Sequence, residues 1–268
     1  MDLGLYQKVK KQIQTILNIN LDHYKDEQMR RRLDSWLSRV GADDWDAYFS
    51  QIQKDKVEWS RFRDFITINV TEFFRDFERW KQVREHILPD LLKENQSQSL
   101  GRFNEGLRVW SAGCSKGAEI YSISMILDDL NSHKKHYLLA TDLDQGALEV
   151  ARNGGPYVHE EIRNVSPVQR GMYFLPGGPP HKLNGTLGKK ITFKEHDLLK
   201  SSYEKNFDLV ICRNVVIYFT ADTKAVLYKK FYDSLRPGGV LFVGGTEIIP
   251  RPQDIGFKSI GFSFYAKK

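Results

Sequence analysis

One segment in the middle of the chain constrains its fold more than any other. Residues 107–130 read LRVWSAGCSKGAEIYSISMILDDL, a short apolar run followed by a glycine turn and a helix. The apolar run is typical of a buried strand, and Gly113 and Gly117 bracket a turn where larger side chains would obstruct a bound ligand. Apolar residues then recur at helical spacing, at Ile120, Ile123, Ile126, Leu127 and Leu130. This order predicts the first strand–turn–helix unit of a nucleotide-binding α/β sheet.

An acidic residue follows at about the spacing expected in such a sheet. The apolar run at 137–141 ends in Asp142, and an acid at the end of the second strand accepts hydrogen bonds from ribose hydroxyls. The turn GCSKG lacks the GxGxxG spacing with which a pyrophosphate is bound. Glu119 also places a negative charge at the helix start, where a phosphate would otherwise sit. These features favour S-adenosylmethionine, which is cationic and has no phosphate, over NAD.

Composition sets the remaining bounds. The 268 residues are enough for one large α/β domain and a smaller module, and the net charge of +6 fits an acidic protein partner or nucleic acid. The only cysteines, Cys114 and Cys212, make a disulfide framework improbable. No apolar run approaches the roughly 18 residues of a membrane span. We expect a cytoplasmic protein without a membrane segment.

The first part of the chain carries helical patterns and almost no strand signal. Its apolar faces predict four helices, with members at Leu5–Leu17, Met29–Val40, Trp45–Ile52 and Val57–Ile66. Gly41 is expected to end the second helix, and Asp43 or Asp44 to cap the third. The second helix carries a run of basic residues, Arg30, Arg31 and Arg32, with Arg39 beyond it. This run is either a solvated face or a docking surface for an acidic helix.

The chain is expected to divide into three parts. Residues 1–74 would form the helical domain, 75–104 a linker helix and a polar loop, and 105–268 the nucleotide-binding domain. The segment TINVTEFFRD at 67–76 mixes aromatic and polar residues, as a loop folded over a ligand does, although Thr71 could instead cap the following helix. Residues 157–190 are too long for a plain connection and predict a small antiparallel β insertion.

Further strands are expected after the insertion. They lie at 191–195, 207–212 and 240–243, with a turn at 237–239 and a closing antiparallel pair at 257–260 and 262–266. The predicted fold class is therefore α/β, with a nucleotide-binding sheet preceded by an all-helical domain.

Five motifs in order resemble those of the chemotaxis receptor glutamate methyltransferases, the CheR type. They are NVTEFFRD at 69–76, VWSAGCSKGAEIYS at 109–122, ATDLD at 140–144, CRNVVIYF at 212–219 and LRPGGVLFVGGTE at 235–247. The resemblance covers nearly the whole chain. It implies a Rossmann-like class I S-adenosylmethionine-dependent methyltransferase domain after an all-helical domain. It also implies methyl transfer from S-adenosylmethionine to receptor glutamates, giving methyl esters and S-adenosylhomocysteine.

The resemblance also implies site residues. The implied cofactor-binding residues are Asn69, Thr71, Arg75, Gly113, Glu119, Asp142, Asp197, Leu198, Arg213 and Asn214. Asp197 and Leu198 would flank the adenine, although relatives commonly have Asn at the position of Asp197. This chain also departs from the usual family turn at Lys116, Ala118 and Ile120, where relatives usually have Thr, Glu and Pro.

The chemistry needs no general base, because a glutamate with a reference pKa near 4.3 is already an anion at neutral pH. Catalysis would then consist of positioning and desolvation. Arg75, Arg213 and Tyr218 are the candidate catalytic residues that orient the acceptor carboxylate. His196 is interpreted as a strand-end histidine, and the histidines show no metal-ligand spacing.

By resemblance, the expected partner is the helical cytoplasmic region of a chemoreceptor. It would be bound through Arg30, Arg31, Arg32 and Arg39, with the β insertion as a second contact, and the enzyme is expected to be a monomer. Two alternatives stay open: methylation of RNA, and a non-catalytic domain that senses S-adenosylmethionine. No NPPY-type signature follows the strand at 207–212, which weighs against methylation of base amino groups.

Overall fold

The computed structural model describes residues 1–67, 70–96, 106–130 and 134–268. The chain divides into two compact units, of which the smaller contains residues 1–68 and 216–226 and the larger contains 69–215 and 227–268. Residues 69–74, expected in the helical part, thus fall in the larger unit, where Phe73 and Phe74 are buried in its core. Most of the predicted polar loop lies outside the described residues.

The smaller unit contains the four predicted helices. They are α1 (Leu3–Leu17), α2 (Asp26–Val40), α3 (Trp45–Ile52) and α4 (Lys56–Thr67), with a 3₁₀ turn at Leu21–His23. Its core is aromatic, and the indole N–H of Trp36 donates to the hydroxyl of Tyr48 at 2.7 Å. Gly41 ends α2 with a φ of 66°, and Asp44 caps α3 by accepting from the backbone N–H of Ala47 at 2.8 Å.

A segment distant in sequence belongs to this helical unit. Residues 216–226 include the 3₁₀ turn Val216–Tyr218 and the beginning of α10 (Ala221–Ser234). The backbone N–H of Lys25 donates to the carbonyl oxygen of Tyr218 at 2.9 Å, and the rings of Tyr24 and Phe219 lie 4.8 Å apart. The apolar pattern did not reveal this arrangement, because it reports which face of a segment is buried but not which element covers it.

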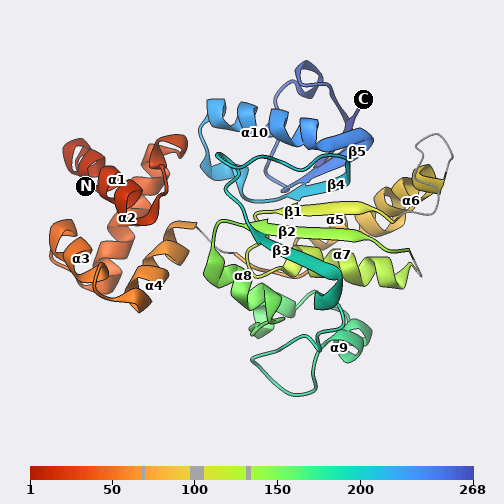
Figure 1. The fold of residues 1–268 in the computed structure, drawn as a ribbon, viewed down its shortest axis with the longest axis horizontal. Helices are drawn as coiled ribbons and strands as arrows, with labels where there is room; N and C mark the ends of the chain where they lie inside the picture. Colours follow the sequence, from red (N-terminus) through yellow and green to blue (C-terminus); the bar gives the residue numbers. More distant parts are fainter. Residues whose placement is uncertain (68–69, 97–105, 131–133) are drawn as a thin grey trace. The chain divides into compact units, whose positions relative to one another are not determined.

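The larger unit is built on a seven-stranded sheet in the order β3-β2-β1-β4-β5-β7-β6. Strands β1 to β5 are labelled in Figure 1. All neighbouring pairs are parallel from β3 to β5, whereas β7 is antiparallel to β5 and to β6. The strands are β1 (Arg108–Ala112), β2 (Tyr137–Asp142), β3 (Ile191–Glu195), β4 (Phe207–Cys212), β5 (Leu235–Val243), β6 (Phe257–Gly261) and β7 (Phe264–Lys267). The chain leaves β1 toward β2 on one side and later returns to β4 on the other, so the carboxyl end of β1 is a topological switch point.

Helices connect these strands. They are α5 (Phe77–Gln82), which continues through a π turn (Val83–Ile87) into α6 (Leu88–Gln96), then α7 (Ala118–Asp129), α8 (Gln145–Arg152), α9 (Pro167–Tyr173) and α10. Short 3₁₀ turns occur at His159–Ile162, Gly188–Lys190 and Pro252–Asp254. Among the described residues, no helix is both long and apolar enough to cross a bilayer.

Two local features differ from the sequence expectations. The turn predicted at 237–239 lies within β5, which pairs with β4 from Leu235 onward and has a register shift opposite Phe207 and Leu209. The segment 157–190 contains two isolated antiparallel bridges, Tyr157 to His181 and Phe174 to Leu183, together with α9, instead of a regular hairpin. Proline and glycine at 176–180 interrupt the chain before longer strands can pair.

Candidate active site

A tight turn closes the carboxyl end of β1. The backbone N–H groups of Gly113 and Cys114 both donate to the carbonyl oxygen of Thr141, at 2.8 and 2.9 Å, and this joins the turn to β2. Gly113 has a φ of +79°, and a Cβ atom there would lie 2.6 Å from a methyl carbon of Val215. Glycine is therefore required for both the backbone conformation and the close approach of the segment that follows β4.

Asp142 lies at the end of β2, beside this turn. One of its carboxylate oxygens accepts from the backbone N–H of Ser115 at 2.7 Å, and the other from the backbone N–H of Asp144 at 2.9 Å. Burial nevertheless raises the pKa of Asp142 to about 6, and the two backbone donors only partly offset that effect. A carboxylate held this way is a strong acceptor for neighbouring hydroxyl groups.

Glu119 lies in the first turn of α7, the helix that follows β1, whereas Asp142 ends the neighbouring strand β2. Its carboxylate accepts from the guanidinium group of Arg213 at 3.2 Å, and from the hydroxyl of Ser111 at 3.4 Å. Burial raises the pKa of Glu119, and the positive charge of Arg213 opposes that rise. Two acids, Glu119 and Asp142, therefore lie beside the glycine turn, and their negative charge suits a cationic ligand and disfavours a phosphate at the start of α7.

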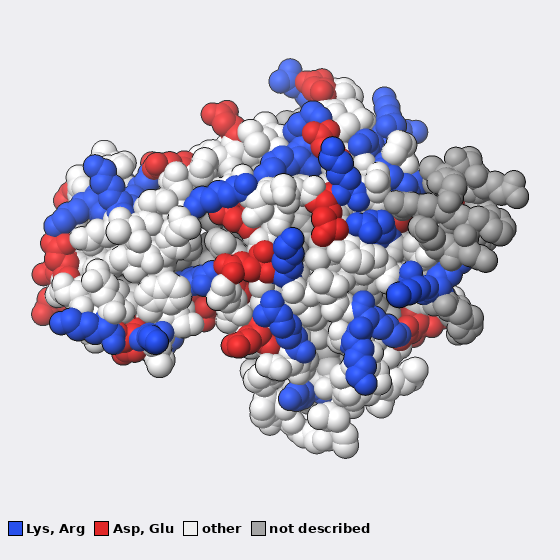
Figure 2. Space-filling model, in the orientation of Figure 1, with Lys and Arg blue, Asp and Glu red and all other residues white. Residues whose placement is uncertain are grey.

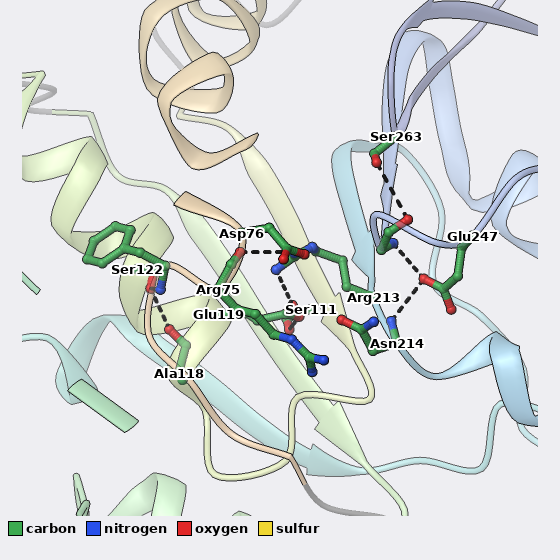
Figure 3. Close-up of polar contacts among 12 residues, drawn as sticks. Arg75, Asp76, Ser111, Ala118, Glu119, Ser122, Arg213, Asn214, Glu247 and Ser263 are labelled. Atoms are coloured by element: carbon green, nitrogen blue, oxygen red, sulfur yellow. Dashed lines mark hydrogen bonds and ion pairs between the residues drawn. The ribbon is translucent and has the colours of Figure 1, made fainter. Parts of the chain in front are cut away.

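Arg213 follows β4 and lies at the centre of the site. Its side chain has no exposed surface, and besides Glu119 it donates to Asp76 at 2.6 Å and to the carbonyl oxygen of Arg75 at 3.0 Å (Figure 3). Its guanidinium carbon lies 4.7 Å from the centre of the Phe242 ring. The next residue, Asn214, has a φ of 58°, and its backbone N–H donates to Glu247 at 2.9 Å.

The segment 70–76 is bonded to α7, to the turn and to the insertion. The hydroxyl groups of Thr71 and Ser115 are 2.9 Å apart, and the backbone N–H of Phe74 donates to the hydroxyl of Ser122 at 3.2 Å. The backbone N–H of Phe73 donates to the carbonyl oxygen of Glu161 at 2.8 Å. These contacts hold the segment against the start of α7, as a loop over a ligand requires.

Glu161 of the insertion also reaches the glycine turn directly. Its carboxylate accepts from the Lys116 ammonium group at 2.8 Å and from the backbone N–H of Val158 at 2.8 Å. The Tyr157 hydroxyl donates to the carbonyl oxygen of Lys116 at 2.8 Å. The ionic partner of Lys116 in this chain is therefore an acid of the insertion.

These elements enclose a small cleft of about 30 Å³, room for one small group. Among the predicted site residues, it is lined by Thr71, Arg75, Gly113, Glu119, Arg213 and Asn214. In Figure 3 no hydrogen bond or ion pair joins the guanidinium group of Arg75 to the other residues drawn. Arg75 therefore offers its charged group to the cleft, whereas Arg213 is committed to protein partners.

The remaining predicted residues lie elsewhere. Asp197 and Leu198 follow β3, next to β2, and Asp197 accepts from the backbone N–H of Leu199 at 2.8 Å. Tyr218 belongs to the helical unit, and Asn69 lies outside the described residues. Burial lowers the pKa of His196 to about 4, so this histidine is neutral at pH 7.

Sequence reasoning did not select Asp76, Ser115 or Glu247 as site residues. Each lies within or beside a motif, but its importance depends on a distant partner, as in the pair of Asp76 and Arg213, 137 residues apart. A local pattern carries no signal for such a pair.

A mixed sheet, parallel from β3 to β5, with a glycine turn at its switch point and acids at the start of α7 and the end of β2 is typical of a class I S-adenosylmethionine-dependent methyltransferase. The sequence matches the family models described as "CheR methyltransferase, all-alpha domain" over residues 5–67 and "CheR methyltransferase, SAM binding domain" over residues 69–265. The chain belongs to the CheR methyltransferase family, and its cofactor is S-adenosylmethionine.

The matches to similar proteins cover most of the chain. A chemotaxis protein methyltransferase of Listeria monocytogenes is 39% identical over 251 residues, which cover 94% of this chain and 92% of that protein. The chemotaxis protein methyltransferase of Escherichia coli K12 is 32% identical over 252 residues, which cover 90% of this chain and 83% of that protein.

Proposed function

We propose that this enzyme methylates glutamate side chains in the cytoplasmic region of a chemoreceptor, giving glutamate methyl esters and S-adenosylhomocysteine. The relatives named above are chemotaxis protein methyltransferases. The observation in this chain that supports a carboxylate acceptor is the Arg75 guanidinium group, which lines the cleft and forms no bond to the residues around it in Figure 3. A guanidinium group matches a carboxylate through two parallel hydrogen bonds.

The residues of the chain position the reactants. Bound S-adenosylmethionine supplies a methyl group on a positively charged sulfur. Asp142 holds the ribose hydroxyls, Glu119 favours the cationic end of the cofactor, and Arg75 orients the acceptor carboxylate. That carboxylate is ionised at pH 7, so no residue has to remove a proton. Positioning alone supplies a large part of the rate enhancement in reactions of this kind.

The roles of the other predicted catalytic residues are then distinct. The Arg213 side chain is fully buried and bonded to Glu119 and Asp76, so we assign it a supporting role rather than contact with the acceptor. Contact between Tyr218 and the acceptor stays a prediction, and the same holds for adenine binding by Asp197 and Leu198.

The face drawn in Figure 2 bears on the alternative of RNA methylation. Basic and acidic side chains are interspersed there and do not form one basic groove. Acidic Glu119 and Asp142 beside the cleft also disfavour an approaching phosphate backbone. The charges on this face therefore give no support to an RNA acceptor.

A label-transfer assay tests the proposal. Purified enzyme is incubated with methyl-labelled S-adenosylmethionine and a chemoreceptor cytoplasmic fragment, and the receptor is then treated with mild alkali. We expect label to enter the receptor and to leave it as volatile methanol, because esters hydrolyse under these conditions. Alkali-stable label would indicate a different acceptor group, and cofactor binding without transfer would support the sensor alternative.

The basic residues of α2 should contribute unequally to receptor docking. The Arg31 side chain is 77% exposed, and Arg39 is also exposed. Arg32 is instead half-buried against Phe65. Its guanidinium carbon lies 4.1 Å from the centre of the Phe65 ring, and its Nε donates to the carbonyl oxygen of Phe65 at 2.9 Å. Arg30 donates to the carbonyl oxygen of Met1. Arg31 and Arg39 are therefore the more exposed candidates for docking, although Arg31 pairs with Glu27 and the guanidinium carbon of Arg39 lies 5.6 Å from the centre of the Phe65 ring.

Reversing Arg31 and Arg39 to Glu should weaken receptor binding about tenfold or more at low salt, with unchanged cofactor affinity. Arg32→Ala should instead lower the melting temperature of the protein. Calorimetric titration with receptor fragment and with S-adenosylhomocysteine, plus thermal unfolding, separates these effects. Equal receptor affinity of the reversed variant and the parent would exclude this face of α2 as the docking surface.

Cofactor affinity should depend on pH through Asp142. Because its pKa is raised to about 6, the carboxyl group is increasingly protonated below that pH, whereas ribose hydroxyls bind best to the ionised form. Binding then releases a proton, so affinity should rise with pH between 5 and 7 by up to about tenfold per unit and level off above. Calorimetry in buffers of different ionisation enthalpy measures this proton release. In Asp142→Asn the dependence should disappear, and its persistence there would assign the titration to another group.

A further inference from the structure

Asp76 directly follows Arg75, the candidate for orienting the acceptor, and has an unusual backbone conformation. It immediately precedes α5, with φ and ψ both at 60°, a left-handed conformation that residues other than glycine rarely adopt. Its own carbonyl oxygen accepts from the backbone N–H of Arg79 at 2.8 Å. The surrounding structure must therefore hold this residue in place.

The contact that holds it is the buried guanidinium group of Arg213. One nitrogen, Nη2, donates both to the Asp76 carboxylate, at 2.6 Å, and to the carbonyl oxygen of Arg75, at 3.0 Å. The other terminal nitrogen is bonded to Glu119 at 3.2 Å. A single buried group therefore fixes the peptide on which the Arg75 side chain is carried, and ties it to the first turn of α7.

We propose that Asp76 is a positioning residue for methyl transfer: with Arg213 it fixes the direction in which Arg75 enters the cleft. The inference rests on the proposed role of Arg75 toward the acceptor carboxylate. Asp76 does not line the cleft, so its effect on the reaction is exerted through Arg75. Misplacement of a catalytic group by about 1 Å can lower a rate by 10².

Asp76 is a better residue for the test than Arg213. The Asp76 side chain is 46% exposed, whereas Arg213 has no exposed surface, so removing Arg213 would leave Glu119 buried without its counter-charge. The variants are Asp76→Ala, Asp76→Asn and Asp76→Glu. Asp90→Asn, an exposed acid in the first turn of α6, is the matched control for loss of charge.

Steady-state kinetics should separate positioning from binding and folding. We expect Asp76→Ala to lower kcat about 30-fold or more, with little change in the KM for S-adenosylmethionine. Its melting temperature should fall by only about 2–4 °C, because alanine is less favourable than aspartate in the left-handed conformation. Asp76→Asn keeps one acceptor oxygen and should lose less, Asp76→Glu should recover part of the rate, and Asp90→Asn should match the parent. An unchanged kcat in Asp76→Ala, or a loss that follows melting temperature, would overturn the proposal.

Hydrogen exchange gives a second measurement that does not depend on the acceptor. In Asp76→Ala the amides of residues 72–77 should exchange faster, while those of β1 and α7 keep their protection. Unchanged exchange at 72–77 would overturn the positioning role. This result does not depend on whether the protein methylates the receptor fragment. Failure of the proposed function is recognised separately, as absence of transfer by the parent enzyme that still binds S-adenosylhomocysteine.

Discussion

Arg75→Ala should lower kcat for methyl transfer to a receptor fragment by about 10²–10³, the loss typical when one charged or polar group that orients the reacting centre is removed. The protein should remain folded, because in Figure 3 the Arg75 guanidinium group has no protein partner among the residues drawn, and only its backbone carbonyl is bonded to Arg213. Initial rates at saturating S-adenosylmethionine, with melting temperature, measure the effect.

Arg75→Lys is the informative companion variant. Lysine keeps the positive charge but loses the planar pair of donors, so we expect a rate between those of the parent and of the alanine variant. A normal rate in Arg75→Ala would remove Arg75 from the mechanism and with it the role assigned to Asp76. A proportional loss of cofactor affinity would instead assign Arg75 to cofactor binding.

Asp142→Ala should weaken S-adenosylmethionine binding by about 10², because two hydrogen bonds from hydroxyls to a charged acceptor contribute roughly 1.5 kcal/mol each. Stability should change little. The backbone N–H groups of Ser115 and Asp144 lose their acceptor, but a buried carboxyl group with a pKa of about 6 is also removed.

The raised pKa of Asp142 determines whether its carboxyl group stabilises or destabilises the folded protein. A carboxyl group whose pKa is raised on folding destabilises the ionised protein, and the penalty is present above pH 6 and disappears as the pH falls below the unfolded value. Calorimetric affinities at pH 7.5 and thermal unfolding at pH 5 and 7.5 test both parts. Parent-like affinity in Asp142→Ala would exclude this residue from ribose binding.

Local patterns were sufficient to predict the elements that we propose bind the cofactor. Glycines at 113 and 117, the apolar run before them and the acid at 142 are short-range signals, and each was found where expected, in β1, the turn, α7 and β2. The helical front of the chain was equally predictable, because helix periodicity and caps such as Gly41 and Asp44 act within a few residues.

The parts that were not predictable depend on partners far apart in the chain. Nothing near Arg213 indicates that its charge is used by Asp76 and Glu119. Nothing near Tyr218 indicates that its segment is bonded to residues 23–25, just before α2. Contacts of the basic run on α2 could not be predicted for the same reason. Burial of Arg32 against Phe65 depends on the fold of α4. The sequence therefore could not show which arginines of this run are half-buried and which are exposed.

The pair of Lys116 and Glu161 limits how this enzyme could exchange parts with its relatives. The insertion and the glycine turn share a salt bridge, so an insertion transplanted from a relative without an acid at position 161 would leave the Lys116 ammonium group, 33% exposed, without its counter-ion. A chimaera that changes residue 116 together with the insertion would avoid this unpaired ammonium group. In this chain the salt bridge couples two segments that lie more than 40 residues apart in sequence.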